Sequence, residues 1–137
     1  MIKVLFVDDD PIRHAFFEKK FSDTTKFDVT QTTLVETALN LIENETWDVV
    51  YLDHDMTDKE AGNLIKDVYG TVHLNGQTIS RFIKALPEDK LANVKEVVIH
   101  SYNATGAKRM LEDIESVGIK VSYIPFDPFN IPEPTNS

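Results

Sequence analysis

The sequence Ile2-Lys-Val-Leu-Phe-Val-Asp-Asp-Asp-Pro11 shows how this chain is organised. Its apolar run ends in three aspartates and a proline, which is typical of a buried strand that leads into a capped helix. Two further apolar runs end in polar clusters: Asp53-His54-Asp55 follows residues 49–52, and His100-Ser101-Tyr102-Asn103 follows residues 97–99. If these runs are parallel central strands, the three clusters meet at one edge of the sheet, where open α/β folds bind ligands.

Strand-like runs alternate with helix-like apolar stripes along the chain, a pattern typical of a parallel sheet covered on both faces. We therefore predict a doubly wound α/β fold with five parallel strands, over residues 2–7, 27–32, 48–52, 96–99 and 120–124. The last helix is expected over residues 104–117, where Gly118 ends it.

The stripes also predict which helix residues face the core. A capping box of Thr33 and Glu36 is expected to open the second helix, and Pro87 to stop the third. The expected core-facing residues are Ile12, Phe16, Phe17 and Phe21 in the first helix, Ala38, Leu41 and Ile42 in the second, and Ile79, Phe82, Ile83 and Leu86 in the third.

Two segments depart from this alternation of strand-like and helix-like stretches. Residues 56–76 are polar and longer than the usual connection, so we expect an insertion or a lid after the third strand, with a short helix over residues 61–69. Residues 131–137 contain two prolines and are expected to form a loose tail on a single domain of residues 1–130.

Composition limits the class of protein. The chain has 137 residues, 42% of them hydrophobic and 27% charged, which suits one self-folding globular domain. It has no cysteine, which excludes disulfides and thiolate chemistry. A net charge of −9 opposes binding along a long nucleic-acid tract, whereas a small phosphorylated ligand or an RNA end stays open if a cation bridges the charges. No membrane span or signal peptide stands out, so a cytoplasmic location is expected.

Adjacent carboxylates at the end of a buried strand resist ionising together unless a cation neutralises them. Asp8, Asp9 and Asp53 offer the oxygen ligands that a hard ion such as Mg²⁺ or Mn²⁺ prefers. The alternative is that Asp9 and Asp10 only cap the first helix.

His54 and His100 follow neighbouring strands, so their rings can lie near each other and near that cation. Histidine titrates near neutrality, so one ring can accept a proton from water while the other donates one to a leaving oxygen. They could instead be metal ligands, which would shift the preference from Mg²⁺ toward Mn²⁺, Fe or Zn²⁺.

The start of the last helix is a candidate phosphate site, because its polar groups and backbone N–H groups collect where the helix dipole favours an anion. The alternative is that Ser101 and Asn103 are ordinary helix caps. The candidate phosphate-binding residues are Ser101, Asn103, Thr105 and Gly106, together with Arg13, His14 and Arg109, which could reach the same pocket.

With Asp8-Asp9, Asp53 and Ser101 after strands one, three and four, nearly the whole chain resembles the receiver domain of two-component response regulators. The resemblance implies the strand order 2-1-3-4-5, Mg²⁺ held by the acidic pair and phosphate accepted by Asp53. The family's lysine after strand five is missing, since Asp127 stands before the proline where the lysine would be. A carboxylate at that point should weaken phospho-signalling through repulsion.

A closer resemblance is to the cyclic-phosphate processing receiver domains, and it accounts for both strand-end histidines. It implies processing of cyclic phosphates on nucleotides or RNA ends. The matching motifs are Asp8-Asp9, Arg13-His14, Leu52-Asp53-His54-Asp55, His100-Ser101-Tyr102-Asn103, Gly106-Ala107 and Arg109-Met110.

Three hypotheses follow. The leading one is a metal-dependent phosphoesterase that opens a cyclic phosphodiester, with His54 and His100 as acid and base. The second is a receiver-type signalling domain in which Asp53 is phosphorylated. The third is a receiver-like domain that binds a cyclic nucleotide or a partner without catalysis.

Overall fold

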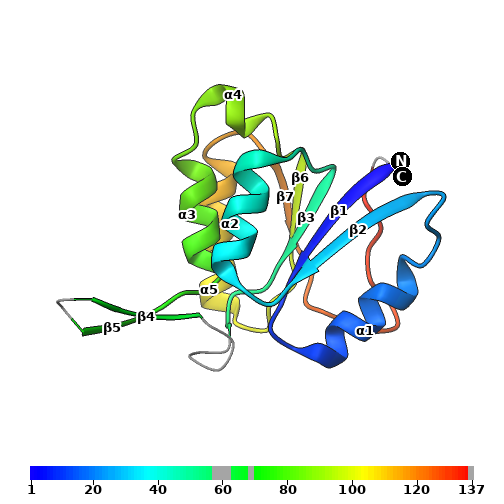
Figure 1. Cartoon of the computed structure of the whole chain (residues 1–137), viewed down its shortest axis with the longest axis horizontal. Coiled ribbons are helices and arrows are strands. Elements are labelled where there is room, and N and C mark those ends of the chain that lie inside the picture. Colours follow the sequence, from blue (N-terminus) through cyan, green and yellow to red (C-terminus); the bar gives the residue numbers. More distant parts are fainter. Residues whose placement is uncertain (57–62, 68–69, 136–137) are drawn as a thin grey trace.

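The computed structural model describes residues 1–56, 63–67 and 70–135 and contains a five-stranded parallel sheet. The strand order is β2-β1-β3-β6-β7, so the predicted order 2-1-3-4-5 is confirmed (Figure 1). The strands of this sheet are β1 (Ile2–Val7), β2 (Phe27–Thr32), β3 (Val49–Leu52), β6 (Glu96–Ile99) and β7 (Lys120–Tyr123). Strands β1, β3 and β6 are central, which explains why they are largely apolar.

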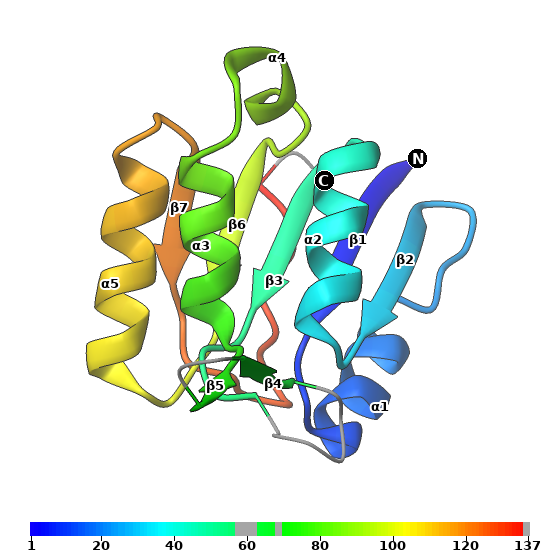
Figure 2. The ribbon, with the colours of Figure 1, turned by 60° about the vertical axis from the view of Figure 1, so that its left-hand side comes forward.

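Helices cover both faces of the sheet. Figure 2 shows α2, α3 and α5 side by side on one face, while α1 lies on the other face. The helices are α1 (Pro11–Lys20), α2 (Val35–Asn44), α3 (Gly76–Lys84), α4 (Glu88–Leu91) and α5 (Ala104–Glu115). Helix α4 is not predicted from the sequence, because four residues are too few to show an apolar stripe.

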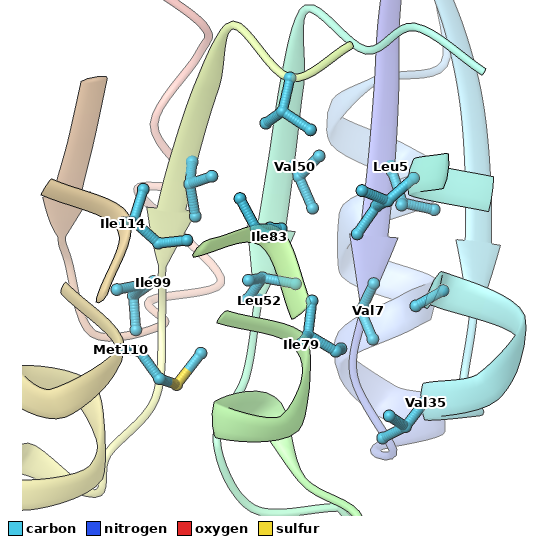
Figure 3. Close-up of a cluster of buried hydrophobic side chains, with 14 of the residues drawn as sticks. Leu5, Val7, Val35, Val50, Leu52, Ile79, Ile83, Ile99, Met110 and Ile114 are labelled. Atoms are coloured by element: carbon cyan, nitrogen blue, oxygen red, sulfur yellow. The ribbon is translucent and has the colours of Figure 1, made fainter. Parts of the chain in front are cut away.

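The face under α2, α3 and α5 holds the larger hydrophobic core. Strand residues such as Leu52 and Ile99 pack there against Ile79 and Ile83 of α3 and Met110 of α5 (Figure 3). The predicted core positions Ile79 and Ile83 are thereby confirmed, and Phe82 is partly buried. Helix α3 ends at Lys84, so Leu86 packs on the core from beyond the helix, and Pro87 is the N-cap of α4 instead of the residue that stops α3.

The prediction for the first helix is half wrong. Phe17 and Phe21 are buried against Phe6 and Tyr51, but Ile12 is 67% exposed and Phe16 is 37% exposed. A ten-residue helix that packs on the sheet with one stripe leaves its other side in solvent, and large aromatic rings at positions 17 and 21 fill the space available.

The face under α1 is completed by the C-terminal segment, which the sequence predicts to be loose. Ile131 is buried, the Tyr51 hydroxyl donates to the Pro132 carbonyl at 2.6 Å, and the Thr135 N–H donates to a Glu96 carboxylate oxygen at 3.2 Å. Residues 131–135 are therefore docked on the sheet, and the expectation of a loose tail is wrong for them. The reason is that the aromatic cluster around Tyr51 extends beyond α1, and Ile131 packs against that part of it.

The predicted capping box of α2 is also wrong. The N-cap is Leu34, which makes no side-chain cap, and the Val35 N–H donates instead to the Asn63 side-chain oxygen at 2.8 Å. Asn63 is fully buried and also donates to the Thr33 carbonyl at 2.8 Å. A residue from the insertion thus supplies the cap, and no local motif could reveal this.

The insertion contains a hairpin in place of the expected helix. Strand β4 (Leu64–Asp67) pairs antiparallel with β5 (Gly70–His73), and the hairpin extends away from the main sheet (Figure 1). Residues 61, 62, 68 and 69 of the predicted helix lie outside the described residues. The hairpin leads into α3, where Asn75 and Thr78 form a capping box. Within the described part of the chain, no helix has the length and apolar content needed to cross a membrane.

Candidate phosphate and cation site

A cleft of about 410 Å³ opens at the carboxyl ends of the central strands, as predicted from their polar clusters. The end of β1 and the first turn of α1 form one wall, and the segments after β3 and β6 form the others. Its lining residues are Asp9, Asp10, Pro11, Arg13, Asp53, Asp55, Ser101 and Tyr102.

Asp8 is fully buried beside this cleft and has several partners. One oxygen of its carboxylate lies 2.7 Å from His100 Nε2 and 3.2 Å from Arg13 Nη1, and the other accepts from the Asp10 N–H at 2.8 Å. Burial alone would raise the pKa of Asp8, but the His100 hydrogen bond and the Arg13 charge outweigh it and hold the pKa below its usual value. Asp8 therefore carries a full negative charge.

Asp53 is only 4% exposed and has weaker support. Its carboxylate accepts from the His54 N–H at 2.9 Å and lies 3.4 Å from Arg13 Nη1. Burial, followed by the negative charge of Asp8, raises the pKa of Asp53 to about 7, although Arg13 opposes the shift. The site is thus short of positive charge when both aspartates are ionised.

Among the described residues, ligand atoms of Asp8, Asp53 and His100 lie within 4.8 Å of one another, which fits a metal ion. Two carboxylates supply the oxygens that Mg²⁺ or Mn²⁺ prefers, and the raised pKa of Asp53 is the shift that a bound cation would reverse. Asp9 of the predicted trio lines the cleft but is not in this group.

His100 is buried beneath the cleft and does not line it. Its ring stacks on Phe6 at 5.0 Å and meets Phe126 edge-on at 5.9 Å. Burial lowers the pKa of His100 despite the contact with Asp8, so the neutral ring donates its Nε2–H to that carboxylate. Nδ1 is buried without a hydrogen-bond partner among the described residues. In this geometry His100 orients Asp8.

His54 sits at the other end of the site. Its Nδ1 lies 2.7 Å from an Asp55 carboxylate oxygen and 3.3 Å from the Asn103 amide nitrogen. The ring packs so closely on Gly106 that a Cβ there would lie 2.4 Å from His54 Cδ2. Gly106 is therefore required, because a side chain at this position would clash with the His54 ring.

The predicted phosphate residues separate into two groups. Ser101 is buried and lines the cleft, with its hydroxyl oxygen accepting from the Asn103 N–H at 3.0 Å. Asn103 is the N-cap of α5 and accepts from the Gly106 N–H at 2.9 Å, as the capping alternative proposed. Thr105 and Arg109 are exposed on α5, and neither lines the cleft.

His14 is turned away from the cleft. Its Nε2 donates to the Asp8 carbonyl at 2.6 Å and its Nδ1 lies 2.7 Å from the Gln31 side-chain oxygen on β2. It therefore holds the backbone of the first acidic cluster and is not placed to touch a phosphate in the cleft.

Sequence reasoning missed two aromatic residues that hold Arg13. The Arg13 guanidinium lies 4.7 Å from the centre of the Tyr102 ring and 5.3 Å from that of Phe126, and the Tyr102 hydroxyl donates to the Phe126 carbonyl. Tyr102 belongs to the third polar cluster, so its place in the sequence was the signal that could have identified it as a site residue. Phe126 lies beyond β7 and gave none.

Asp127 does not occupy the site either. It is exposed and accepts from the Phe129 N–H at 3.0 Å, which caps a local turn. The repulsion expected from a carboxylate in the lysine position is thus absent from the cleft. Arg13 brings a cation to the carboxylates from α1 instead.

The fold and the acidic cleft define a receiver-type domain, and solved receiver structures agree. The receiver domain of a Pseudomonas aeruginosa sensor histidine kinase, which has magnesium coordinated in its active-site cleft, superposes with a TM-score of 0.61 at 19% identity, covering 94% of this chain and 89% of that one. A Francisella response regulator receiver domain gives 0.59 at 24% identity, covering 95% and 89%. A putative response regulator from Chloroflexus aurantiacus gives 0.63 at 17% identity, covering 94% and 89%.

The family model for the cyclic-phosphate processing receiver domain matches residues 3–116, and the chain belongs to this family. The match runs from β1 through β6 to the end of α5, and it ends before β7. Among curated proteins, none matches the sequence.

Proposed function

We propose that this chain is a receiver-type domain that accepts a phosphoryl group on Asp53 from a small phosphorylated donor. The observation that carries the proposal is the position of the Asp53 carboxylate in the cleft, 3.4 Å from the Arg13 guanidinium and beside the acidic residue Asp8. The likeness to receiver domains supports it.

Asp8 and Asp53, with Asp9 at the rim, would hold Mg²⁺ or Mn²⁺. When bound, the ion supplies positive charge that offsets the charge on the phosphoryl oxygens. Arg13 takes the part that a lysine plays after the last strand of a receiver, and the Ser101 hydroxyl at the opposite wall can donate to a phosphoryl oxygen.

The reaction is a simple displacement. An ionised Asp53 oxygen attacks the phosphorus of the donor, the bond to the leaving oxygen breaks, and that oxygen departs with the electron pair. Asp53 must be ionised to attack, and its raised pKa means that a neutral or alkaline pH favours the reaction.

The test is phosphoryl uptake, measured by intact mass spectrometry after incubation with acetyl phosphate and Mg²⁺ at pH 8. We expect one phosphoryl group per chain in the native protein and none in Asp53→Asn. Asp55→Asn is the matched control, because Asp55 also lines the cleft but bonds to His54 and Asn103, and it should still be labelled. Equal uptake in Asp53→Asn would overturn the proposal.

Hydrolysis of a cyclic phosphate is the second candidate, and the family match favours it. Water would attack the phosphorus, one ester bond would open, and the leaving oxygen would take a proton, with the substrate a cyclic nucleotide or an RNA end. We assign the acid or base role to His54, because its side chain is 14% exposed, whereas that of His100 is 4% exposed and is held on Asp8 beneath the cleft.

This candidate is tested on 2′,3′-cyclic nucleotides, cyclic dinucleotides and RNA with a cyclic phosphate end, with Mg²⁺ or Mn²⁺ and then with chelator. Hydrolysis adds the mass of one water to a substrate, and we expect the gain to disappear in His54→Ala. If no substrate changes in mass while Asp53 is labelled, phosphoryl acceptance is the function that remains and hydrolysis is excluded for these substrates. Tight binding without product or label would identify a binding domain.

A further inference from the structure

The guanidinium of Arg13 lies where a cation is needed. A single nitrogen, Nη1, lies 3.2 Å from an Asp8 carboxylate oxygen and 3.4 Å from an Asp53 carboxylate oxygen. The Asp8 and Asp53 carboxylates both belong to the group that fits a metal ion. Arg13 and a divalent ion would therefore compete for the same two carboxylates.

Arg13 also has a second set of contacts that does not involve these oxygens. Its guanidinium lies over the Tyr102 and Phe126 rings at 4.7 and 5.3 Å, and its Nε is 3.8 Å from an Asp10 carboxylate oxygen at the cleft wall. Cation–π contacts with the two rings and the ion pair with Asp10 would still stabilise the guanidinium after it moves away from Asp8 and Asp53. The side chain itself lines the cleft, so this movement needs no change in the backbone.

We propose that Arg13 is an exchangeable counter-ion of the carboxylate pair, and that its displacement by a divalent cation turns it toward the phosphoryl group. The inference rests on the cation site of the proposed function. Without the ion, Arg13 neutralises Asp8 and Asp53. With the ion bound, the Arg13 guanidinium stays over the Tyr102 and Phe126 rings, and its N–H donors face the cleft. Cation binding and anion binding then strengthen each other, as reciprocal coupling requires.

The sign of the effect on metal affinity is distinctive. An ordinary supporting residue of a cation site weakens metal binding when it is removed. A competitor strengthens it, because its contacts with the carboxylates no longer have to be broken. Charge-assisted hydrogen bonds of this kind correspond to a change in affinity of about tenfold.

The first experiment is a calorimetric titration of the protein with Mn²⁺ alone at pH 8. We expect Arg13→Gln to bind Mn²⁺ about tenfold more tightly than the native chain. Arg13→Lys retains the positive charge and should stay within about threefold of the native value. Equal or weaker binding in Arg13→Gln would overturn the proposal.

The second experiment uses the native chain, so it holds even if Arg13→Gln is poorly folded. The Nε–H resonance of Arg13 in a ¹H–¹⁵N spectrum should shift as Mg²⁺ is added, and inorganic phosphate should bind more tightly with Mg²⁺ than without it. An unmoved resonance at saturating Mg²⁺ would refute the exchange. Neither readout involves phosphoryl transfer, so tighter Mn²⁺ binding in Arg13→Gln without labelling of Asp53 would remove the proposed function and leave the exchange standing.

Discussion

Gly76→Ala is expected to destabilise the protein by about 3 kcal/mol or more, because no space exists for a Cβ at this position. The added carbon would lie 2.0 Å from the Asp53 carbonyl oxygen, 2.8 Å from His54 Cα and 2.7 Å from Met110 Cε. Two of these atoms are backbone, and the Gly76 N–H also donates to the His54 carbonyl at 2.8 Å. Helix α3 therefore begins in direct contact with the segment that carries Asp53.

Urea unfolding measures this effect, and Gly118→Ala is the matched control. Gly118 follows α5 with a φ of +80°, and a Cβ added to it would meet no atom of the described residues within 4 Å. Alanine there should therefore cost only about 1–2 kcal/mol of backbone strain. A Gly76→Ala protein as stable as Gly118→Ala would show that the segment after β3 moves freely.

Asp53→Asn is expected to stabilise the metal-free protein at pH 8 by about 2–4 kcal/mol and to change little at pH 4. The pKa of Asp53 is about 7 in the folded state and near 3.8 in the unfolded state. The folded state therefore holds a proton that the unfolded state has lost between these values, so the native protein loses stability as the pH rises through this window. Asparagine cannot ionise and avoids that loss.

The difference between native and variant unfolding free energies at pH 4, 6 and 8 isolates this effect from other titrating groups. Asp55→Asn is a control of opposite sign, because the hydrogen bond from His54 holds the pKa of Asp55 below its usual value, and its ionised form is therefore favoured in the folded state. A constant difference between Asp53→Asn and the native chain across this pH range would contradict the buried, poorly neutralised carboxylate.

The fold was predictable because its signals are local. Each central strand is a short apolar run that ends in a polar cluster, and a buried parallel sheet requires such runs. The order of the strands came from the resemblance of those clusters to a receiver domain. The core face of α3 followed from the spacing of Ile79 and Ile83, which are both fully buried.

The wrong predictions concern contacts between residues far apart in the chain. Asn63 caps α2 from 28 residues away, and Tyr51 holds the Pro132 carbonyl across 81 residues. A search for local caps finds Thr33 and Glu36 because their spacing is right, but it cannot see that a buried amide from the insertion already satisfies the helix. The hairpin of β4 and β5 escapes prediction for a similar reason, since strand pairing leaves little trace in a polar segment.

The candidate site was predicted in its location but not in its internal contacts. Asp8, Asp53 and Ser101 were expected together, and the structure brings Asp8 and Asp53 together and puts Ser101 in the wall of the cleft. The partner of Asp8 is His100, which was expected to face a substrate. Side-chain direction at a strand end depends on the pleat and on neighbouring rings, which residue order alone does not determine.

The most direct measurement of the site is the binding of Mg²⁺ to the native chain and to Asp8→Asn, by calorimetry at pH 8. The proposed cation site depends on Asp8, which contacts His100 and Arg13 and raises the pKa of Asp53. We predict saturable binding of one Mg²⁺ by the native protein and its loss in Asp8→Asn. Native protein that binds no Mg²⁺, or Asp8→Asn that binds it equally well, would contradict a cation site built on Asp8 and Asp53.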